Sequence, residues 1–273
     1  MRKIYILLVF IFCWQIPISY AGHESRSHGG RSAAMGFADV GLKDFWALRN
    51  NQAGLAYITQ ISGGIYYENR YLIPEMGFQS IGIAIPVKNS VIGITADYFG
   101  DENFNETTIG LAFAKQLFKN FSMGIQMDYL TTFVDNDSFG RHHLLTFELA
   151  LMYELTEGIT IGFHTYNPFE TKLNKDAQEI IPATYSLGGA FHINDNLRIS
   201  SEIEKVTDRD ESFKMGVEYK VAKKTWVRAG VGTRPGIFSF GFETAWKNIV
   251  FQFASSKHPT LGYSPMASLI VGF

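Results

Sequence analysis

The sequence predicts an all-β protein, a transmembrane antiparallel β-barrel of about 14 strands with an N-terminal helical or turn segment plugging the lumen. From about Thr59 onward, large apolar residues alternate with small, polar or charged ones, which is the period of a strand with two unlike faces. About fourteen such segments are near the ~9 to 11 residues that a tilted spanning strand needs. Tight turns alternate with longer polar loops between them, as in barrels with short periplasmic turns and longer external loops.

Residues 1–21 have the pattern of a secretory signal peptide. A basic start precedes an apolar run from Ile4 to Ile16, and small residues lead to an expected cleavage after Ala21. The run is shorter than the roughly 20 residues of a membrane helix, so we expect it to be removed. Cys13, the only cysteine, lies inside it. The expected mature chain therefore has no disulfide, metal-thiolate site or cysteine nucleophile.

The charge balance gives no footprint for nucleic acid. The chain has 24 Lys and Arg residues against 26 Asp and Glu residues, and loss of Arg2 and Lys3 with the signal peptide leaves 22 against 26. A nucleic-acid-binding domain is expected to be strongly basic. No nucleic-acid partner is therefore expected.

Residues 22–57 are expected to form a flexible N-terminus followed by a lumenal plug. Residues 22–32 are polar and glycine-rich, which predicts a flexible, solvated tail. Residues 33–57 interleave apolar and small residues, which predicts one or two short helices and a tight turn near Asn50 to Gly54. A segment of this composition is better suited to fill a lumen than a fully polar tail.

Residues 58–273 are expected to form the barrel. The clearest alternation runs from Leu145 to Tyr153, where every second residue is large and apolar. The expected strands begin near residues 58, 76, 89, 106, 120, 144, 158, 183, 196, 212, 224, 236, 248 and 263. The tight turns fall at Lys88-Asn89, Lys119-Asn120, Thr156-Glu157-Gly158, Asn194-Asp195-Asn196, Lys223-Lys224 and Lys247-Asn248, and the longer loops include Gly100 to Asn105, Asp135 to His143, Phe169 to Ile181 and Lys257 to Tyr263.

Two further features favour a membrane barrel over a soluble periplasmic sheet protein. Aromatic residues cluster where strands meet connections, as in the girdles at the two bilayer interfaces. Strands that face lipid must also pair every backbone N–H and C=O, and only a closed barrel does this. The last strand ends on Phe273, an ending that resembles those of outer-membrane proteins and implies recognition by the barrel-assembly machinery.

Two motifs precede the first strand. In the stretch from Gly30 to Val40, Arg31, Met35, Gly36 and Ala38 have the spacing of a G-x-R-x-x-x-M-G-x-A start, and Asn51-Gln52-Ala53-Gly54-Leu55-Ala56 follows N-P-A-G-L-A with Gln52 in place of proline. Together they resemble the entry segment of the FadL-like outer-membrane barrels, in particular the PorV/PorQ family of Bacteroidetes-type bacteria. Gly54 remains available for the tight turn. The plug and turn residues that the resemblance marks are Met35, Gly36, Asp39, Trp46, Asn51, Ala53 and Gly54.

The resemblance implies a location in the outer membrane of a Gram-negative, Bacteroidetes-type bacterium, in contact with outer-membrane lipid, and two competing functions. The PorV/PorQ likeness implies an accessory or partner-binding component of type IX-like protein secretion at the cell surface, which engages a translocon or exported cargo. The wider FadL likeness implies a channel for uptake of hydrophobic small molecules, past an N-terminal hatch and through a gap in the barrel wall. Short external loops favour the first reading, and a porin-like structural protein stays open as a third.

Charged residues of both signs are expected to face the lumen. The main candidates are Asp128, Glu148, Glu202, Lys214, Glu218, Arg228 and Glu243, and the same alternation adds His164, Arg198, Glu204, Lys220 and Arg234. They suit a selectivity path, but pairing among themselves is favoured because an isolated buried charge is costly. We therefore interpret them as structural.

No catalytic or metal site is expected, and no cofactor. His142 and His143, with Asp135 and Ser138 nearby, do not form the base and orienting group that a serine nucleophile needs. His23, Glu24 and His28 have neither the spacing nor the rigid support of a metal site. The loop from Phe169 to Ile181 has an apolar tip that suits a partner protein or a lipophilic ligand, or else folds over the barrel mouth.

Overall fold

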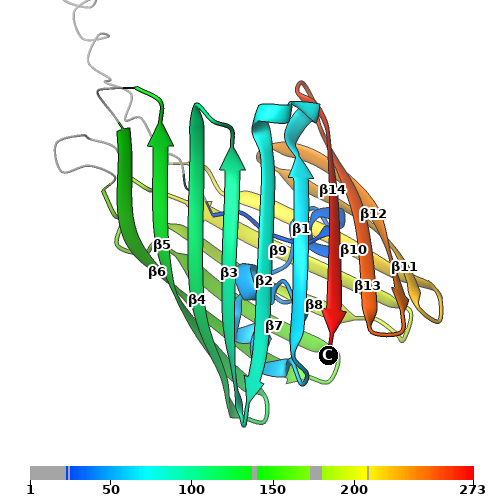
Figure 1. Cartoon of the computed structure of the whole chain (residues 1–273). Helices are drawn as coiled ribbons and strands as arrows, with labels where there is room; N and C mark the ends of the chain where they lie inside the picture. The colour runs from blue at the N-terminus through cyan, green and yellow to red at the C-terminus, as the bar shows by residue number, and fades with distance from the viewer. Residues whose placement is uncertain (1–22, 24, 137–139, 173–179, 208) are drawn as a thin grey trace, which may run out of the picture.

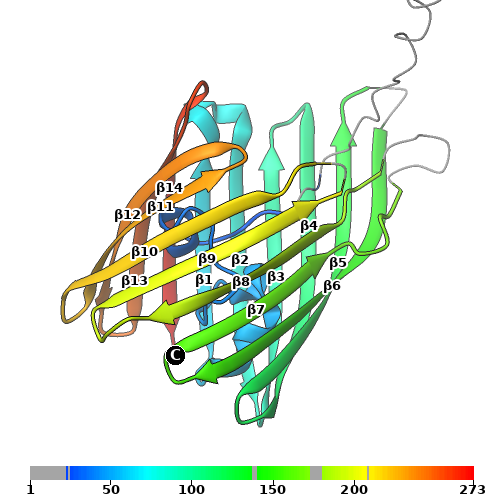
Figure 2. The same ribbon diagram turned by 180° about the vertical axis from the view of Figure 1, so that it is seen from behind.

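Fourteen antiparallel strands close into one barrel (Figures 1 and 2). The structure, a computed structural model, describes residues 23, 25–136, 140–172, 180–207 and 209–273. The strands are β1 (Ser62–Asn69), β2 (Gly77–Val87), β3 (Ser90–Gly100), β4 (Phe104–Phe118), β5 (Phe121–Val134), β6 (Gly140–Thr156), β7 (Ile159–Tyr166), β8 (Thr184–His192), β9 (Leu197–Val206), β10 (Ser212–Ala222), β11 (Thr225–Thr233), β12 (Gly236–Trp246), β13 (Ile249–His258) and β14 (Gly262–Gly272). The predicted fold class is confirmed, and each strand begins within about four residues of its expected start.

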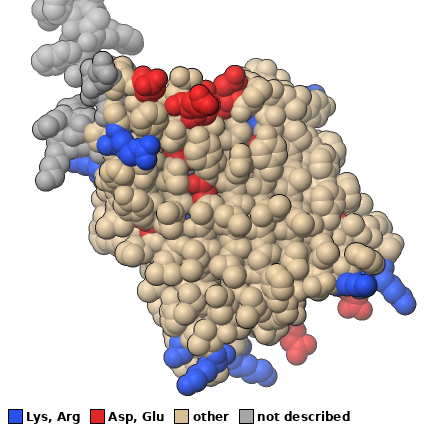
Figure 3. Space-filling view, in the orientation of Figure 1, with Lys and Arg blue, Asp and Glu red and all other residues tan. Residues whose placement is uncertain are grey.

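The closing pair joins the first and last strands. Ile65 of β1 pairs with Leu269 of β14 on one side and with Ile81 of β2 on the other. All three side chains point outward and are at least one third exposed, whereas Ser80 beside them is buried. The same alternation around the ring gives an apolar exterior, which Figure 3 shows as a broad surface almost free of charge between two charged ends. An apolar outer band with a polar interior is the pattern of a membrane-spanning barrel.

The tight turns are where the sequence placed them, and they gather at one end of the barrel together with the C-terminus (Figure 1). The opposite end carries the other connections, including η2 (Arg70–Leu72) and η3 (Pro74–Met76) between β1 and β2. By the usual arrangement of such barrels, the first end is periplasmic and the second is external. Among the described residues, no helix is both long and apolar enough to cross a membrane.

One expected loop differs from the prediction, and a second agrees with one of its two expected arrangements. β6 begins at Gly140 because its pairing with β5 continues up to Val134, so His142 and His143 lie in a strand and not in an external loop. In the loop from Phe169 to Ile181, residues 173–179 lie outside the described residues. Ile181 is fully buried against Leu130 and Tyr166, so this part of the loop folds into the barrel mouth.

The N-terminal segment lies inside the barrel, where Figures 1 and 2 draw it in blue. It contains α1 (Gly30–Ala34), α2 (Ala47–Asn50) and η1 (Gln52–Tyr57), and almost all of its residues from 28 to 55 are buried. The expected solvated tail is wrong for its described part, since His23 and His28 are buried. The His23 backbone N–H donates to Glu106 (2.8 Å) and the His28 backbone N–H to Asn50 (2.7 Å). The polar composition of this segment predicted exposure to solvent, but side chains in the polar lumen provide the hydrogen bonds that its polar groups need.

Candidate functional site

One half of the plugged lumen is apolar. Phe45, Trp46, Leu48 and Leu55 of the plug pack on the lumen side of the wall, where Tyr66 of β1 and Phe78 of β2 are the large residues. The ring centroids of Trp46 and Tyr66 are 5.8 Å apart and those of Tyr66 and Phe78 are 6.0 Å apart, both edge to face. Such aromatic pairs add to the burial of apolar area. The plug and the wall therefore share a continuous aromatic surface here.

The other half holds the plug by charge, first at Arg49. Its Nη1 donates to Asp128 Oδ1 (2.7 Å) and Glu148 Oε1 (3.1 Å), and its Nε lies 3.2 Å from Asp97 Oδ2. Asp128 and Glu148 are almost completely buried. Glu148 Oε2 also accepts a hydrogen bond from Gln52 Nε2 (2.7 Å) and lies 2.6 Å from His164 Nε2. Arg49 of the plug thus forms ion pairs with three carboxylates of the wall.

Arg31 forms the second cluster. Its Nε and Nη2 each donate to a different oxygen of Glu218 at 2.9 Å, and its Nη1 donates to Asp44 (3.1 Å). Glu218 also accepts from Arg228 Nε (2.7 Å), and Arg228 Nη2 donates to Glu243 (2.9 Å). A bidentate arginine and carboxylate pair fixes orientation as well as distance. Arg31 therefore holds α1 against the wall near β10 to β12.

In the third cluster, a wall carboxylate accepts hydrogen bonds from the plug backbone. Glu202 accepts the backbone N–H groups of Asp39 (2.9 Å) and Val40 (3.0 Å), and Lys214 Nζ lies 3.1 Å from Glu202 and 2.7 Å from Glu204. Burial and then the nearby Glu202 charge raise the pKa of Asp39 to about 8. The Asp39 carboxyl also accepts a hydrogen bond from Ser32 Oγ, which ties the two ends of this part of the plug together.

The plug backbone approaches the wall closely at several wall glycines, two of which lie in β10 and β11. A Cβ on Gly230 of β11 would lie 2.1 Å from Gly36 N, and one on Gly216 of β10 would lie 2.5 Å from Met35 Cβ. Gly36 itself has φ +67°, a conformation that few other residues adopt. Met35 and Gly36, marked by the resemblance, thus lie at one of the places where plug and wall have no room for a wall side chain.

The predicted turn motif is a capped 3₁₀ turn. Asn51 Oδ1 accepts from the Ala53 N–H (3.1 Å), while its Nδ2 donates to the Val40 carbonyl (2.6 Å). Ala53 O accepts from Ser122 Oγ of β5 (2.9 Å). Gly54 is required for close packing and not for an unusual φ, because a Cβ there would lie 2.8 Å from Ala47 Cβ.

Sequence reasoning brought together the wall carboxylates but missed their plug partners. All seven main lumen candidates lie on the interior face, and Asp128, Glu148, Glu202, Glu218 and Arg228 are buried. Pairing is thus favoured over a selectivity path. Arg31 and Arg49 were not singled out, although both lie in the segment that was expected to enter a lumen with several acidic residues on its wall, which was an available signal. Phe273 is exposed at the C-terminus, and its role in assembly stays a prediction.

Gln52 gives a direct test of the turn. It stands where the family pattern has proline, and proline is tolerated at the first position of a helical turn. We expect Gln52→Pro to keep the turn but lose the bond to Glu148, which lowers the free energy of unfolding by about 1–3 kcal/mol. Urea unfolding measures this, with Gln79→Ala on the exposed outer face as control. A proline variant as stable as the natural chain would contradict the role of this bond.

The catalytic and metal alternatives gain no support. His143 Nδ1 bonds the Tyr129 hydroxyl (2.7 Å) on the outer face of the wall, whereas His142 lies on the opposite face of β6, so the adjacent histidines do not act together. Ser138 and Glu24 lie outside the described residues. Within the ranges that the structure describes, no group of three or more His, Cys, Asp or Glu side chains is placed to hold a metal ion.

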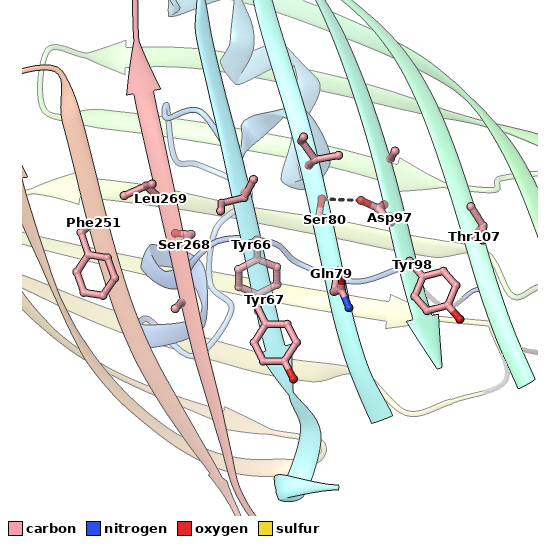
Figure 4. Close-up of a pocket in the computed structure, with 14 residues that line it drawn as sticks. Tyr66, Tyr67, Gln79, Ser80, Asp97, Tyr98, Thr107, Phe251, Ser268 and Leu269 are labelled. Atoms are coloured by element: carbon pink, nitrogen blue, oxygen red, sulfur yellow. Dashed lines mark hydrogen bonds between the residues drawn. The ribbon is translucent and has the colours of Figure 1, made fainter. Parts of the chain in front are cut away.

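An apolar groove runs over the outer wall across β14, β1, β2 and β3 (Figure 4). Its two adjoining parts have volumes of about 670 and 560 Å³ and share the outward side chains of Ile65, Ile81 and Leu269. The wall beneath is unbroken, since β14, β1, β2 and β3 are paired along the groove. Among these described strands, the gap in the wall that the FadL reading implied is not present.

Comparison with known proteins shows which solved structures have a similar fold. No protein-family model and no curated protein matches the chain. Solved structures do match: the CymD monoaromatic hydrocarbon channel (TM-score 0.72, 14% identity, 90% of this chain and 98% of that one), the Ralstonia pickettii toluene transporter TbuX (0.70, 13%, 90% and 97%) and a Pseudomonas aeruginosa FadL homologue (0.63, 14%, 92% and 99%). At such identities the likeness shows a FadL-like outer-membrane β-barrel fold. It does not show the finer PorV/PorQ assignment.

Proposed function

We propose that this protein is an outer-membrane channel for hydrophobic small molecules, gated by its own N-terminal plug. The observation that carries the proposal is the division of the lumen into an apolar half, where Trp46 faces Tyr66, and a charged half, where Arg31 and Arg49 are held. Fold relatives described as a monoaromatic hydrocarbon channel and a toluene transporter support it.

The two halves differ in how easily they separate. Contacts between apolar groups can be replaced by contacts with an apolar solute at little cost, because burial is non-directional. Separating a buried ion pair leaves uncompensated charges and costs several kcal/mol. A hydrophobic solute therefore passes between the plug and the wall at β1 and β2, where Tyr66 and Phe78 lie, while the Arg31 and Arg49 clusters keep the plug attached. This assigns the charged half to anchoring and the apolar half to passage.

The second candidate is an accessory component of type IX-like protein secretion. Short external connections favour it: only Arg234 and Pro235 join β11 to β12, and residues 101–103 join β3 to β4. So short a rim provides little chain for a capture site for small molecules. In this reading the sealed barrel binds a translocon or exported cargo.

A reversible cross-link tests the channel. A Cβ on Gly241 of β12 would lie 2.7 Å from Ala34 Cβ of the plug. A disulfide needs a Cβ separation of about 3.5–4.5 Å, so the double variant Ala34→Cys/Gly241→Cys requires a parting of roughly 1 Å. The expected mature chain has no other cysteine, since Cys13 lies in the signal segment.

The measurement is uptake of labelled toluene by a Gram-negative host without its own hydrophobic-solute channels. We expect uptake with the natural chain, with both single-cysteine variants and with the double variant in its reduced and its oxidised form, because the cross-link joins the plug to β12 on the side where the plug stays anchored. A strong loss of uptake on oxidation would show that passage requires the plug to leave this side, and would contradict the proposed route. Uptake no better than that of cells with empty vector would refute the channel. Co-purification of secretion components with the natural chain would then favour the second candidate.

A further inference from the structure

Unpaired lysines gather at the periplasmic end of the barrel. They are Lys88, Lys115, Lys119, Lys223, Lys224 and Lys247, here called the lysine arc, and all are exposed. Figure 3 shows Lys and Arg side chains on both sides of the lower end of this face. None of the six takes part in an ion pair within the part of the chain that the structure describes. At the external end, by contrast, the exposed Lys205 and Arg234 pair with Glu211 (3.1 Å) and Asp210 (3.3 Å).

The arc extends around the part of the ring that contains the β14–β1 junction. Its members lie at or close to the turns β2–β3, β4–β5, β10–β11 and β12–β13, so they flank this junction on both sides. The remaining tight turns, β6–β7 and β8–β9, carry the exposed acids Glu157 and Asp195. A cationic surface confined to one side of a membrane protein attracts anions at that side only.

The depth of the arc matches a lipid headgroup layer. Phe118, Trp246 and Phe273 are the most exposed aromatics of this end, at 69%, 68% and 77%. Exposed aromatic rings at the end of an apolar band mark the bilayer interface. Lys247 Nζ lies 4.9 Å from the Trp246 ring centroid, so its ammonium group is at the same level. The lysines therefore lie where phosphate groups are found.

The apolar groove lies over the β14–β1 junction that the arc flanks, and Figure 4 draws the part of it nearer the external end. Its lower part is lined by Gly63, Ile83, Val271 and the terminal Phe273. Its upper part continues past the small side chains of Ala96 and Ala267 toward the external end. The missing side chain of Gly63 leaves room for an aliphatic chain that lies along the wall.

We propose that the lysine arc and this groove bind an anionic phospholipid of the periplasmic leaflet, with an acyl chain in the groove and the phosphate at Lys88 and Lys247 of the turns on either side of it, while the other lysines of the arc add to the local positive charge. Two independent features support this assignment. One is the set of lysines at the depth of the lipid headgroups, and the other is the apolar groove, which runs along the outer wall in the direction of the lipid acyl chains. The site does not depend on whether the lumen conducts. Each lysine near an anionic surface contributes roughly a fivefold gain in binding.

The test uses the full mature protein in mixed micelles and compares phosphatidylglycerol with phosphatidylcholine by native mass spectrometry. We expect a more than tenfold preference for phosphatidylglycerol, falling as salt is raised. The variant Lys88→Gln/Lys119→Gln/Lys247→Gln is expected to lose most of that preference. Lys205→Gln/Lys257→Gln at the external end is the matched control and is expected to stay within about twofold of the natural chain.

A groove variant separates the two parts of the site. Gly63→Leu fills the lower groove and is expected to weaken binding of both lipids without changing their ratio. Heat-modifiable migration on gels shows that each variant is folded. Equal binding of the two lipids by the natural chain, or an unchanged preference in the triple variant, would overturn the proposal.

Discussion

Arg49→Met is expected to release the plug from the β3, β5 and β6 side and to lower the free energy of unfolding by about 3–5 kcal/mol. The guanidinium is the shared partner of Asp97, Asp128 and Glu148, and all three carboxylates are buried. Methionine fills much of the volume but leaves these charges close together without a cation. The cost therefore comes from uncompensated charge and not from a cavity.

Urea unfolding and protease cleavage of the plug measure the effect. Lys205→Gln, which breaks a pair whose side chains are 46% and 49% exposed, is the control and is expected to change stability by less than about 1 kcal/mol. Adding Glu148→Gln to Arg49→Met removes one unpaired charge and is expected to restore part of the loss. An Arg49→Met protein with natural stability and an intact plug would show that the cluster does not hold the segment.

The fold was predictable because the strand period is a local property of the chain. Leu145 to Tyr153 alternates without a break, and this alone orients Glu148 toward the lumen. Turn residues such as Lys119-Asn120 mark where each hairpin reverses, so the strand starts could be located closely. No long-range information was needed for either step.

The partners within the lumen could not be predicted in the same way. Arg49 and Glu148 are 99 residues apart, and Arg31 and Glu218 are 187 apart. These ion pairs form only if the plug enters the lumen to a particular depth and faces particular strands. The alternation of residues within the strands gives no information on either. For the same reason the burial of His23 and His28 could not be predicted, because polar residues are compatible with solvent and with a polar lumen equally.

The function was harder to predict from the sequence than the fold or the contacts in the lumen. The entry motif and the short external loops favoured a secretion accessory, whereas the fold relatives and the divided lumen favour a channel. A short motif specifies how the plug turns and packs: Asn51 caps the turn and Gly54 packs against Ala47. That is a structural requirement which barrels of different function share.

Gly230→Val is expected to open the lumen while leaving the barrel intact. The new Cβ would lie 2.1 Å from Gly36 N and 2.2 Å from the Met35 carbonyl carbon, so it meets backbone that cannot rotate away. Valine suits a strand, and β11 keeps its pairing with β10 and β12. The strain therefore falls on the plug, which has to leave the wall at Met35 and Gly36.

Single-channel recording measures the result, and we expect a change from a nearly silent barrel to a steady conductance. Ala229→Val is the matched control, since it places the same side chain one residue away on the exposed outer face of β11. Both variants should keep heat-modifiable migration, which shows a closed barrel. A silent, folded Gly230→Val barrel would mean that the plug can yield at this contact without leaving the lumen, and the contact between Gly36 and Gly230 would then not be what seals it.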